Sequence, residues 1–272
     1  MQPKVLYLGW DVGGWEGARD GLAVLTADAH GALRLAQAPV RVGLKPLLCS
    51  GALSVAGLLS ACACREPWER MVLGIDAPLG WPAQFARSVI ETPAAVPIYL
   101  PAPDAGEMAN RLAYRWCDRV IHRVCGKKPL SATFDRLGNN CTKAITACSL
   151  LAANDGARPA AARGPEAPVT FLEAYPALWK AGAGKTGDPV AGAAAALAAC
   201  HLPAAGSDEL DAVLCALTAA CYDNRARGLG LSLPQVAFPE DFAHVVEDPP
   251  ESTIAAEGWA YFPLDAAITR GA

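Results

Sequence analysis

The chain has 272 residues, a hydrophobic content of 53% and a formal net charge of −4. So much apolar sequence excludes general disorder and can build the core of one large α/β domain or two modest ones. The small net charge means that a nucleic-acid surface must come from local clustering of basic residues. Ten cysteines are too dilute for a disulfide scaffold, so we expect reduced thiols. The N-terminus lacks the features of a secretory signal, so we expect a cytoplasmic protein.

The first forty residues contain three candidate strands, at residues 5–11, 22–27 and 32–36. Strands so close in sequence indicate antiparallel hairpins. The charge-free stretch 46–64 predicts a helix buried against the sheet, with a membrane span as the less favoured alternative. Residues 71–76 then predict a short buried strand that stops at an Ala-Pro dipeptide. A helix between two strands suggests a parallel crossover.

The second half of the chain predicts further helices and one more strand. Apolar residues recur at every fourth position between 108 and 124, which predicts a helix over residues 107–124. One strand is expected at residues 169–175. The remaining predicted helices lie at about residues 140–153, 189–200 and 207–226.

Acidic residues stand at or near the ends of three predicted strands, at Asp11, Asp76 and Glu173. A charge there is costly unless it faces a cleft at the edge of the sheet. Asp208 and Asp211 lie three apart at the start of a serine-capped helix, so both could join the same cluster. Carboxylates brought together repel one another unless a cation neutralises them, and Mg²⁺ or Mn²⁺ prefers oxygen ligands. We therefore expect a divalent metal site, although each acid taken singly could equally be a helix cap or a turn residue.

A basic stripe lies beside the apolar stripe of the helix predicted over residues 107–124. Its members continue beyond the helix: Arg111, Arg115, Arg119, Arg123, Lys127, Lys128, Arg136 and Lys143. The stripe could hold the phosphates of a nucleic-acid backbone, with Arg115 and Lys127 steering it, or be a solvated helix face. Within it, Asp118 could orient His122 or fix Arg115 for substrate, or form an ordinary surface ion pair.

Residues 182–186, GAGKT, imitate the end of a phosphate-binding loop. The first glycine of that motif would fall on Trp179, and the strand-to-helix context is missing. We therefore expect no ATP site there and keep Lys185 as a candidate phosphate contact.

Six segments in a fixed order carry a resemblance to a known family. They are GWDVGGW at 9–15, GIDAPLGWP at 74–82, YRWCDRVIHRVCGKKPLSATFDRLG at 114–138, FLEAYPALW at 171–179, DELDAVLCALTAA at 208–220 and EGWAYFP at 257–263. The sequence resembles domain of unknown function family 429 (DUF429), whose members are regarded as ribonuclease H-like nucleases. The turn at residues 15–20 departs from this pattern because it is longer than expected between the first two strands.

The resemblance implies an α/β fold of the ribonuclease H-like type, in which three antiparallel strands and then parallel strands form a mixed central sheet flanked by helices. Carried over by position, it makes Asp11, Asp76, Glu173 and Asp211 the catalytic acids and metal ligands, with Asp208 as a further candidate ligand. We expect one domain over residues 1–272. A helical insertion is expected at about 105–155, and an acidic, Pro-rich wrap or lid at about 228–272.

The leading hypothesis is a nuclease in which Mg²⁺ or Mn²⁺ activates water and stabilises the leaving oxygen of a phosphodiester. Its partner would be DNA or RNA and not a membrane, and dimerisation stays open. One rival is an actin-like phosphotransferase, in which Asp11, Gly13 and Gly14 approach the phosphates of ATP. The other is a catalytically silent protein that keeps the fold to bind nucleic acid or protein.

Overall fold

The computed structural model describes residues 4–15, 19–28, 30–90, 107–133, 135, 137–161, 167–180, 191–204, 206–242 and 251–264. Within these residues the chain forms a mixed α/β fold around an eight-stranded sheet, in the order β3-β2-β1-β5-β7-β6 with β4 beside β2 and β8 beside β7. The strands are β1 (Val5–Asp11), β2 (Asp20–Ala27), β3 (Leu33–Leu35), β4 (Val40–Val42), β5 (Arg70–Asp76), β6 (Arg158–Pro159), β7 (Val169–Ala174) and β8 (Ala260–Tyr261). β2 runs antiparallel to β1, β3 and β4, whereas β5 is parallel to both β1 and β7.

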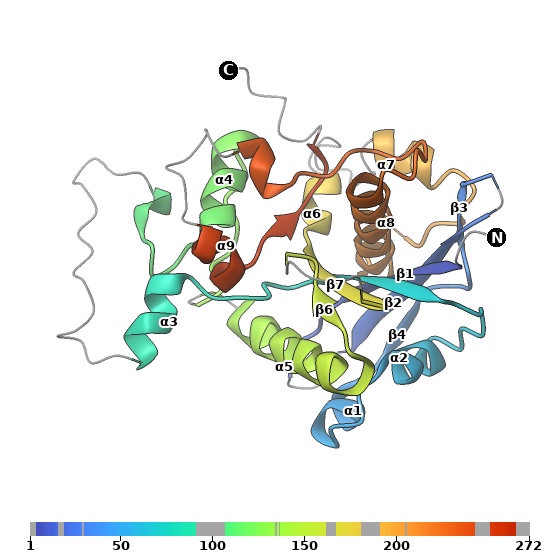
Figure 1. Cartoon of the computed structure of the whole chain (residues 1–272), viewed down its shortest axis with the longest axis horizontal. Helices are drawn as coiled ribbons and strands as arrows, with labels where there is room; N and C mark the ends of the chain where they lie inside the picture. The colour runs from blue at the N-terminus through green and yellow to red at the C-terminus, as the bar shows by residue number, and fades with distance from the viewer. Residues whose placement is uncertain are drawn as a thin grey trace.

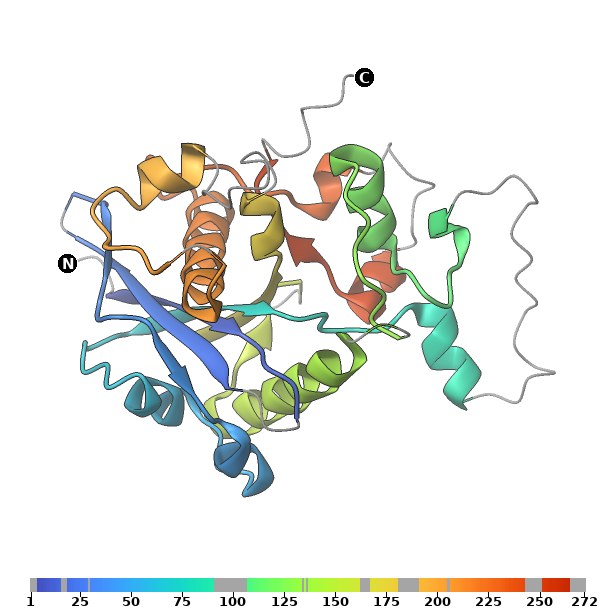
Figure 2. The same cartoon turned by 180° about the vertical axis from the view of Figure 1, so that it is seen from behind.

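Helices cover both faces of the sheet (Figures 1 and 2). They are α1 (Lys45–Cys49), α2 (Val55–Ala61), α3 (Ala83–Ile90), η1 (Glu107–Ala109), α4 (Trp116–Cys125), α5 (Leu137–Asp155), α6 (Pro176–Trp179), α7 (Ala191–Ala196), α8 (Asp208–Arg227), η3 (Pro239–Phe242) and α9 (Glu251–Glu257). Successive strand residues face opposite sides of a sheet, so two cores form. Tyr7 and Val72 pack on the side of α6 and α8, whereas Leu8 and Leu73 pack on the side of α1, α2 and α5.

The early antiparallel strands and the two buried strands at β5 and β7 confirm the predicted core of the sheet. The helix predicted over residues 46–64 is wrong as a single element. It divides into α1 and α2, because Gly51 adopts a φ of 72° and Ser54 caps α2 by accepting a hydrogen bond from the Gly57 amide. Among the described residues no helix is long and apolar enough to cross a membrane.

The helix predicted over residues 107–124 begins only at Trp116, so this prediction is also wrong at its N-terminal end. The preceding residues form the short helix η1 and a turn, in which the Asn110 carbonyl accepts from the Ala113 and Tyr114 amides. Gly126, with a φ of 65°, ends α4. All ten cysteines are free, as expected.

Part of the C-terminal segment belongs to the core. β8 pairs in parallel with β7, and Trp259 and Phe262 are buried beside it. The short strands β4, β6 and β8 have too few residues to give a recognisable alternation, so sequence patterns did not predict them.

Three glycines let α8 lie directly against the sheet. A Cβ atom on Gly9 would stand 1.8 Å from the Ala212 carbonyl oxygen, and one on Gly74 would stand 2.2 Å from that of Cys215. A Cβ atom on Gly21 would stand 2.4 Å from the Asp208 carbonyl oxygen. These glycines lie on β1, β5 and β2, so α8 packs backbone to backbone across three strands. The first turn of α8 is thereby held at the end of β1, where Asp11 lies.

We predict that Gly9→Ala destabilises the fold, because the new methyl group must displace the backbone of α8. Overpacking of this kind costs about 1–3 kcal/mol or more. The matched control is Gly43→Ala, since a Cβ atom there meets nothing within 4 Å. Urea unfolding monitored by circular dichroism measures both variants. Equal midpoints for the two would contradict the close packing of α8.

Candidate functional site

Asp11 and Asp76 lie side by side at the carboxyl ends of two parallel strands. They are direct register partners in the pairing of β1 with β5. Each stands two positions after a glycine that faces α8, so both side chains point to the α8 side of the sheet. Both are half-buried. The structure therefore brings two of the predicted acids together.

Asp211 reaches the same place from the first turn of α8, and its charge acts on both strand acids. Burial raises the pKa of Asp11 from 3.8 to about 7, and the charges of Asp211, Asp208 and Asp20 add to this rise. Burial and the charges of Asp11 and Asp211 also hold the pKa of Asp76 well above its usual range. Desolvation and mutual repulsion both disfavour the ionised forms of these carboxyl groups.

Lys180 is the cation that opposes this repulsion, and the sequence analysis did not select it. Its Nζ atom lies 2.5 Å from Oδ1 of Asp211, and its charge lowers the pKa of both Asp11 and Asp76. Lys180 directly follows the FLEAYPALW segment, and its place after α6 is the signal that could have identified it.

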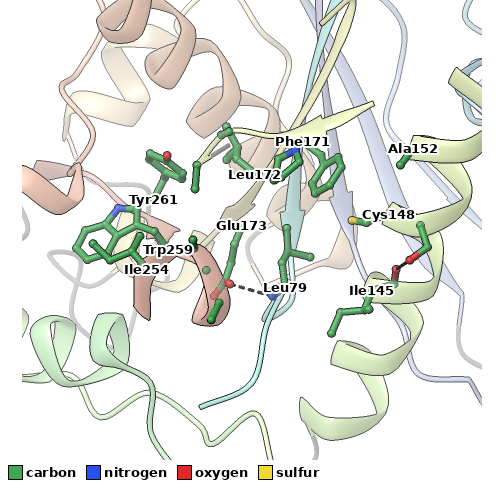
Figure 3. A pocket seen from close by; sticks show the side chains of 17 residues that line it. Leu79, Ile145, Cys148, Ala152, Phe171, Leu172, Glu173, Ile254, Trp259 and Tyr261 are labelled. Atoms are coloured by element: carbon green, nitrogen blue, oxygen red, sulfur yellow. Dashed lines mark hydrogen bonds between the residues drawn. The ribbon is translucent and has the colours of Figure 1, made fainter. Parts of the chain in front are cut away.

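Glu173 faces the other side of the sheet. Its register partner on β5 is Ile75, one residue before Asp76, and Ile75 packs in the core formed with α2 and α5. Arg115 donates to both carboxylate oxygens, at 2.6 and 2.7 Å, and the Leu79 amide donates to Oε2 at 3.0 Å. Figure 3 shows Glu173 pointing to Leu79, which lies in the segment that follows β5. These contacts engage both carboxylate oxygens of Glu173, and its role as a metal ligand stays a prediction.

Arg115 is 2% exposed, which corrects its predicted role in steering a nucleic-acid backbone. Asp118 binds this arginine through both carboxylate oxygens and also caps α4 by accepting from the Arg115 amide. Of the alternatives for Asp118, fixing Arg115 is thus the one observed, within the interior and not at the surface. His122 lies one turn further along α4 and is half-buried.

Other predicted residues have partners of their own or lie outside the described chain. Asp208 begins α8, where its charge acts on Asp11, and it pairs with Arg41 at 2.7 Å. Lys143 does not belong to an exposed basic stripe, because it is buried and its Nζ atom lies 2.8 Å from both carboxylate oxygens of Asp20. Arg136 and Lys185 lie outside the described residues.

Two cavities flank Glu173. One, of about 380 Å³, is mainly apolar and lies between α5, β7 and the α9–β8 segment; Figure 3 shows Ile145, Phe171 and Trp259 on its walls. The other, of about 370 Å³, is charged and lies beside Asp76. Its polar lining comprises Asp76, Arg115, Asp118, Lys127, Lys128, Glu173 and Tyr175.

Lys127 lines the charged cavity and is half-buried. Burial and the charge of Lys180 lower its pKa, while the charges of Asp76 and Asp211 oppose that change. Its Nζ atom lies 5.6 Å from the centre of the Tyr175 ring. Lys127, a predicted phosphate contact, therefore lies in the region of Asp76 and Asp211.

The fold and site define a mixed α/β protein with paired acids at the carboxyl ends of adjacent parallel strands. Residues 9–178 match the family described as "Protein of unknown function (DUF429)", and the chain belongs to this family. No curated protein and no solved structure matches the chain.

We predict that Glu173→Gln destabilises the protein by about 3 kcal/mol, because loss of one partner from a buried ion pair leaves the other poorly compensated. The control is Glu66→Gln, which removes a half-exposed partner of Lys4 and Arg34 and should leave the free energy of unfolding almost unchanged. Chemical denaturation at neutral pH gives both values. A Glu173→Gln variant as stable as Glu66→Gln would mean that the Arg115 contact is unimportant for folding.

We predict that Asp11→Asn stabilises the metal-free protein above pH 7 by up to about 4 kcal/mol. The pKa of Asp11 is about 7 in the folded chain and near 3.8 when unperturbed, so the native state binds the extra proton between these values. Stability therefore falls as pH rises from 4 to 7, and an asparagine abolishes that loss. The stability gained by Asp11→Asn should vanish near pH 4, where the native Asp11 is protonated.

A matched control for this experiment is Asp28→Asn. Backbone hydrogen bonds from His30 and Ala32 lower the pKa of Asp28, so its ionised form favours the native state. This variant should be less stable than the native chain at pH 7, so its change in the free energy of unfolding has the opposite sign to that of Asp11→Asn. Thermal unfolding in the presence of EDTA at pH 4 and pH 8 tests both, and an Asp11→Asn variant that loses stability at pH 8 refutes the repulsion.

Proposed function

We propose that this chain is a metal-dependent phosphodiesterase of the ribonuclease H-like type that acts on nucleic acid, with Asp11 and Asp76 as its principal metal ligands. One observation carries the proposal: the two acids are register partners at adjacent strand ends, and the pKa of Asp11 is raised to about 7. Shifted carboxyl groups at the carboxyl ends of parallel strands are typical of functional sites.

The topology supports the ribonuclease H-like part of the proposal. The order β3-β2-β1-β5-β7 places an antiparallel set of strands first and parallel strands after it. This is the arrangement that the family resemblance implied. α8 then lies across β1, β2 and β5 and contributes Asp211 at their ends.

The donor set of Asp11, Asp76 and Asp211 fits a hard divalent cation, because it offers only carboxylate oxygens. As the side chains stand, no three His, Cys, Asp or Glu in the described ranges are grouped closely enough to hold an ion. Asp11 and Asp76 would therefore hold the ion, and Asp211 would join if Lys180 released it. The ion would polarise the phosphate and lower the pKa of a bound water.

Other residues take supporting roles in this proposal. Glu173 is a positioning residue, because it ties Arg115 to the Leu79 amide in the segment that follows Asp76. Lys180 and Lys127 bring positive charge to a region of three acids, where it would offset the charge of a phosphate. Both lysines act without displacing Asp11 or Asp76.

A catalytically silent binding protein is the second candidate, and the ion pairs favour it. Arg115 occupies Glu173, and Lys180 occupies one oxygen of Asp211, which leaves fewer free ligands than an active two-metal site uses. The actin-like alternative loses support, because the Gly13 amide donates to Asp20 and is not open to an ATP phosphate.

We predict that the full chain cleaves single-stranded or duplex oligonucleotides in Mn²⁺ or Mg²⁺, and that Asp11→Asn and Asp76→Asn each lower the rate at least a hundredfold, because each removes one of the two principal ligands. Glu66→Gln, far from the site, is the control. Gel assays give the rates, and calorimetry with Mn²⁺ gives ion binding. Absence of both cleavage and Mn²⁺ binding would remove the proposal and leave the silent binding protein.

A further inference from the structure

We propose that the charged cavity beside Asp76 is a subsite for one phosphorylated nucleotide unit, whose phosphate is bound by Lys127 and Lys128. The inference rests on the proposed function, because the phosphate would then lie beside the acids. It also defines the substrate class: a nucleic-acid strand whose terminal nucleotide enters the cavity, and not the interior of a duplex. A nucleoside monophosphate then serves as a probe of the subsite and is not itself a substrate.

The position of the two lysines is the first support. They are consecutive, yet both line the same cavity, directly after Gly126 ends α4. Buried Pro129 follows them, which restricts the backbone of this short segment. Lys127 is placed over the ring of Tyr175, and Lys128 lies 6.0 Å from the ring centre of Tyr114. Two ammonium groups at one cavity are an arrangement that suits a phosphate.

Lys127 and Lys128 are the cationic side chains of the lining besides Arg115. This arginine is already paired with Glu173 and Asp118. The acidic side chains of the lining are these two and Asp76. A phosphate would therefore bind to Lys127 and Lys128 next to an acid, which is the geometry a phosphodiesterase needs for its scissile group.

The size and apolar lining of the cavity favour a single nucleotide. Its volume of about 370 Å³ lies at the small end of the range for small-molecule sites. Between the charged groups its walls are apolar, and a sugar or base could pack on them: Pro78, Ile121, Pro129, Leu130, Leu137 and Ala177. A duplex instead needs cations spaced along its backbone, and burial removes Arg115 and Lys143 from the stripe that could have supplied them.

Binding of AMP to the full chain in EDTA tests the inference without any catalytic step. We expect saturable binding by calorimetry, and a loss of about tenfold in affinity for Lys127→Gln, the effect of removing one charge-assisted hydrogen bond. The control is Arg123→Gln, an exposed cation on α4 outside the cavity lining, which should change the affinity less than twofold. Asp76→Asn should bind AMP more tightly, because it removes a like charge next to the phosphate.

Two results would overturn the inference: no binding of AMP, or equal losses for Lys127→Gln and Arg123→Gln. Adenosine and inorganic phosphate serve as separate probes, and we expect both to bind more weakly than AMP. Cleavage in Mn²⁺ without AMP binding would leave the proposed function standing and remove the subsite. AMP binding with the expected variant pattern, but without cleavage in any metal, would remove the phosphodiesterase and keep the subsite.

Discussion

The approach of α8 to the sheet is the constraint on which the rest of the site depends. Gly9, Gly21 and Gly74 leave no side chain between the strands and the helix backbone, so α8 lies closer than packed side chains would allow. The same close approach sets the first turn of α8 at the ends of β1 and β5. Asp211 is therefore held near Asp11 and Asp76, at a position where its charge raises the pKa values of both strand acids. Packing of the core and convergence of the acids have a single structural cause.

The acids at the strand ends differ in role because they differ in register. Asp11 and Asp76 share a face of the sheet, and their repulsion is only partly offset by Lys180. Glu173 is one position out of phase, faces the opposite side, and is fully engaged by Arg115. A protein selected only for stability would neutralise the first pair as completely as it neutralises Glu173. Destabilising charge that is retained at a strand end is typical of functional positions.

The strands that carry the acids could be predicted from the sequence, because hydrophobic runs and early turns are local signals. The face that Glu173 occupies could not, since it depends on the pairing of β7 with β5. The prediction of an exposed basic stripe was wrong at two of its members for a similar reason. Arg115 and Lys143 look like surface cations in their helices, but their partners lie 58 residues away at Glu173 and 123 residues away at Asp20. Spacing along a helix cannot reveal which distant element covers it.

The buried arginine network also fixes the cavity that the lysines line. Glu257 accepts from the amides of Trp116 and Ala83, so α9 holds both the start of α4 and the segment that follows β5. Arg115 adds a contact to the Glu257 carbonyl and its pair with Glu173 on β7. The elements that form the cavity walls are therefore tied together by buried charges before any ligand arrives. A phosphate entering such a site meets ammonium groups on a fixed frame, and the ordering cost of binding is correspondingly small. Burial of Arg115 removes one cation from the surface, yet its contacts also fix the walls of the cavity that Lys127 and Lys128 line.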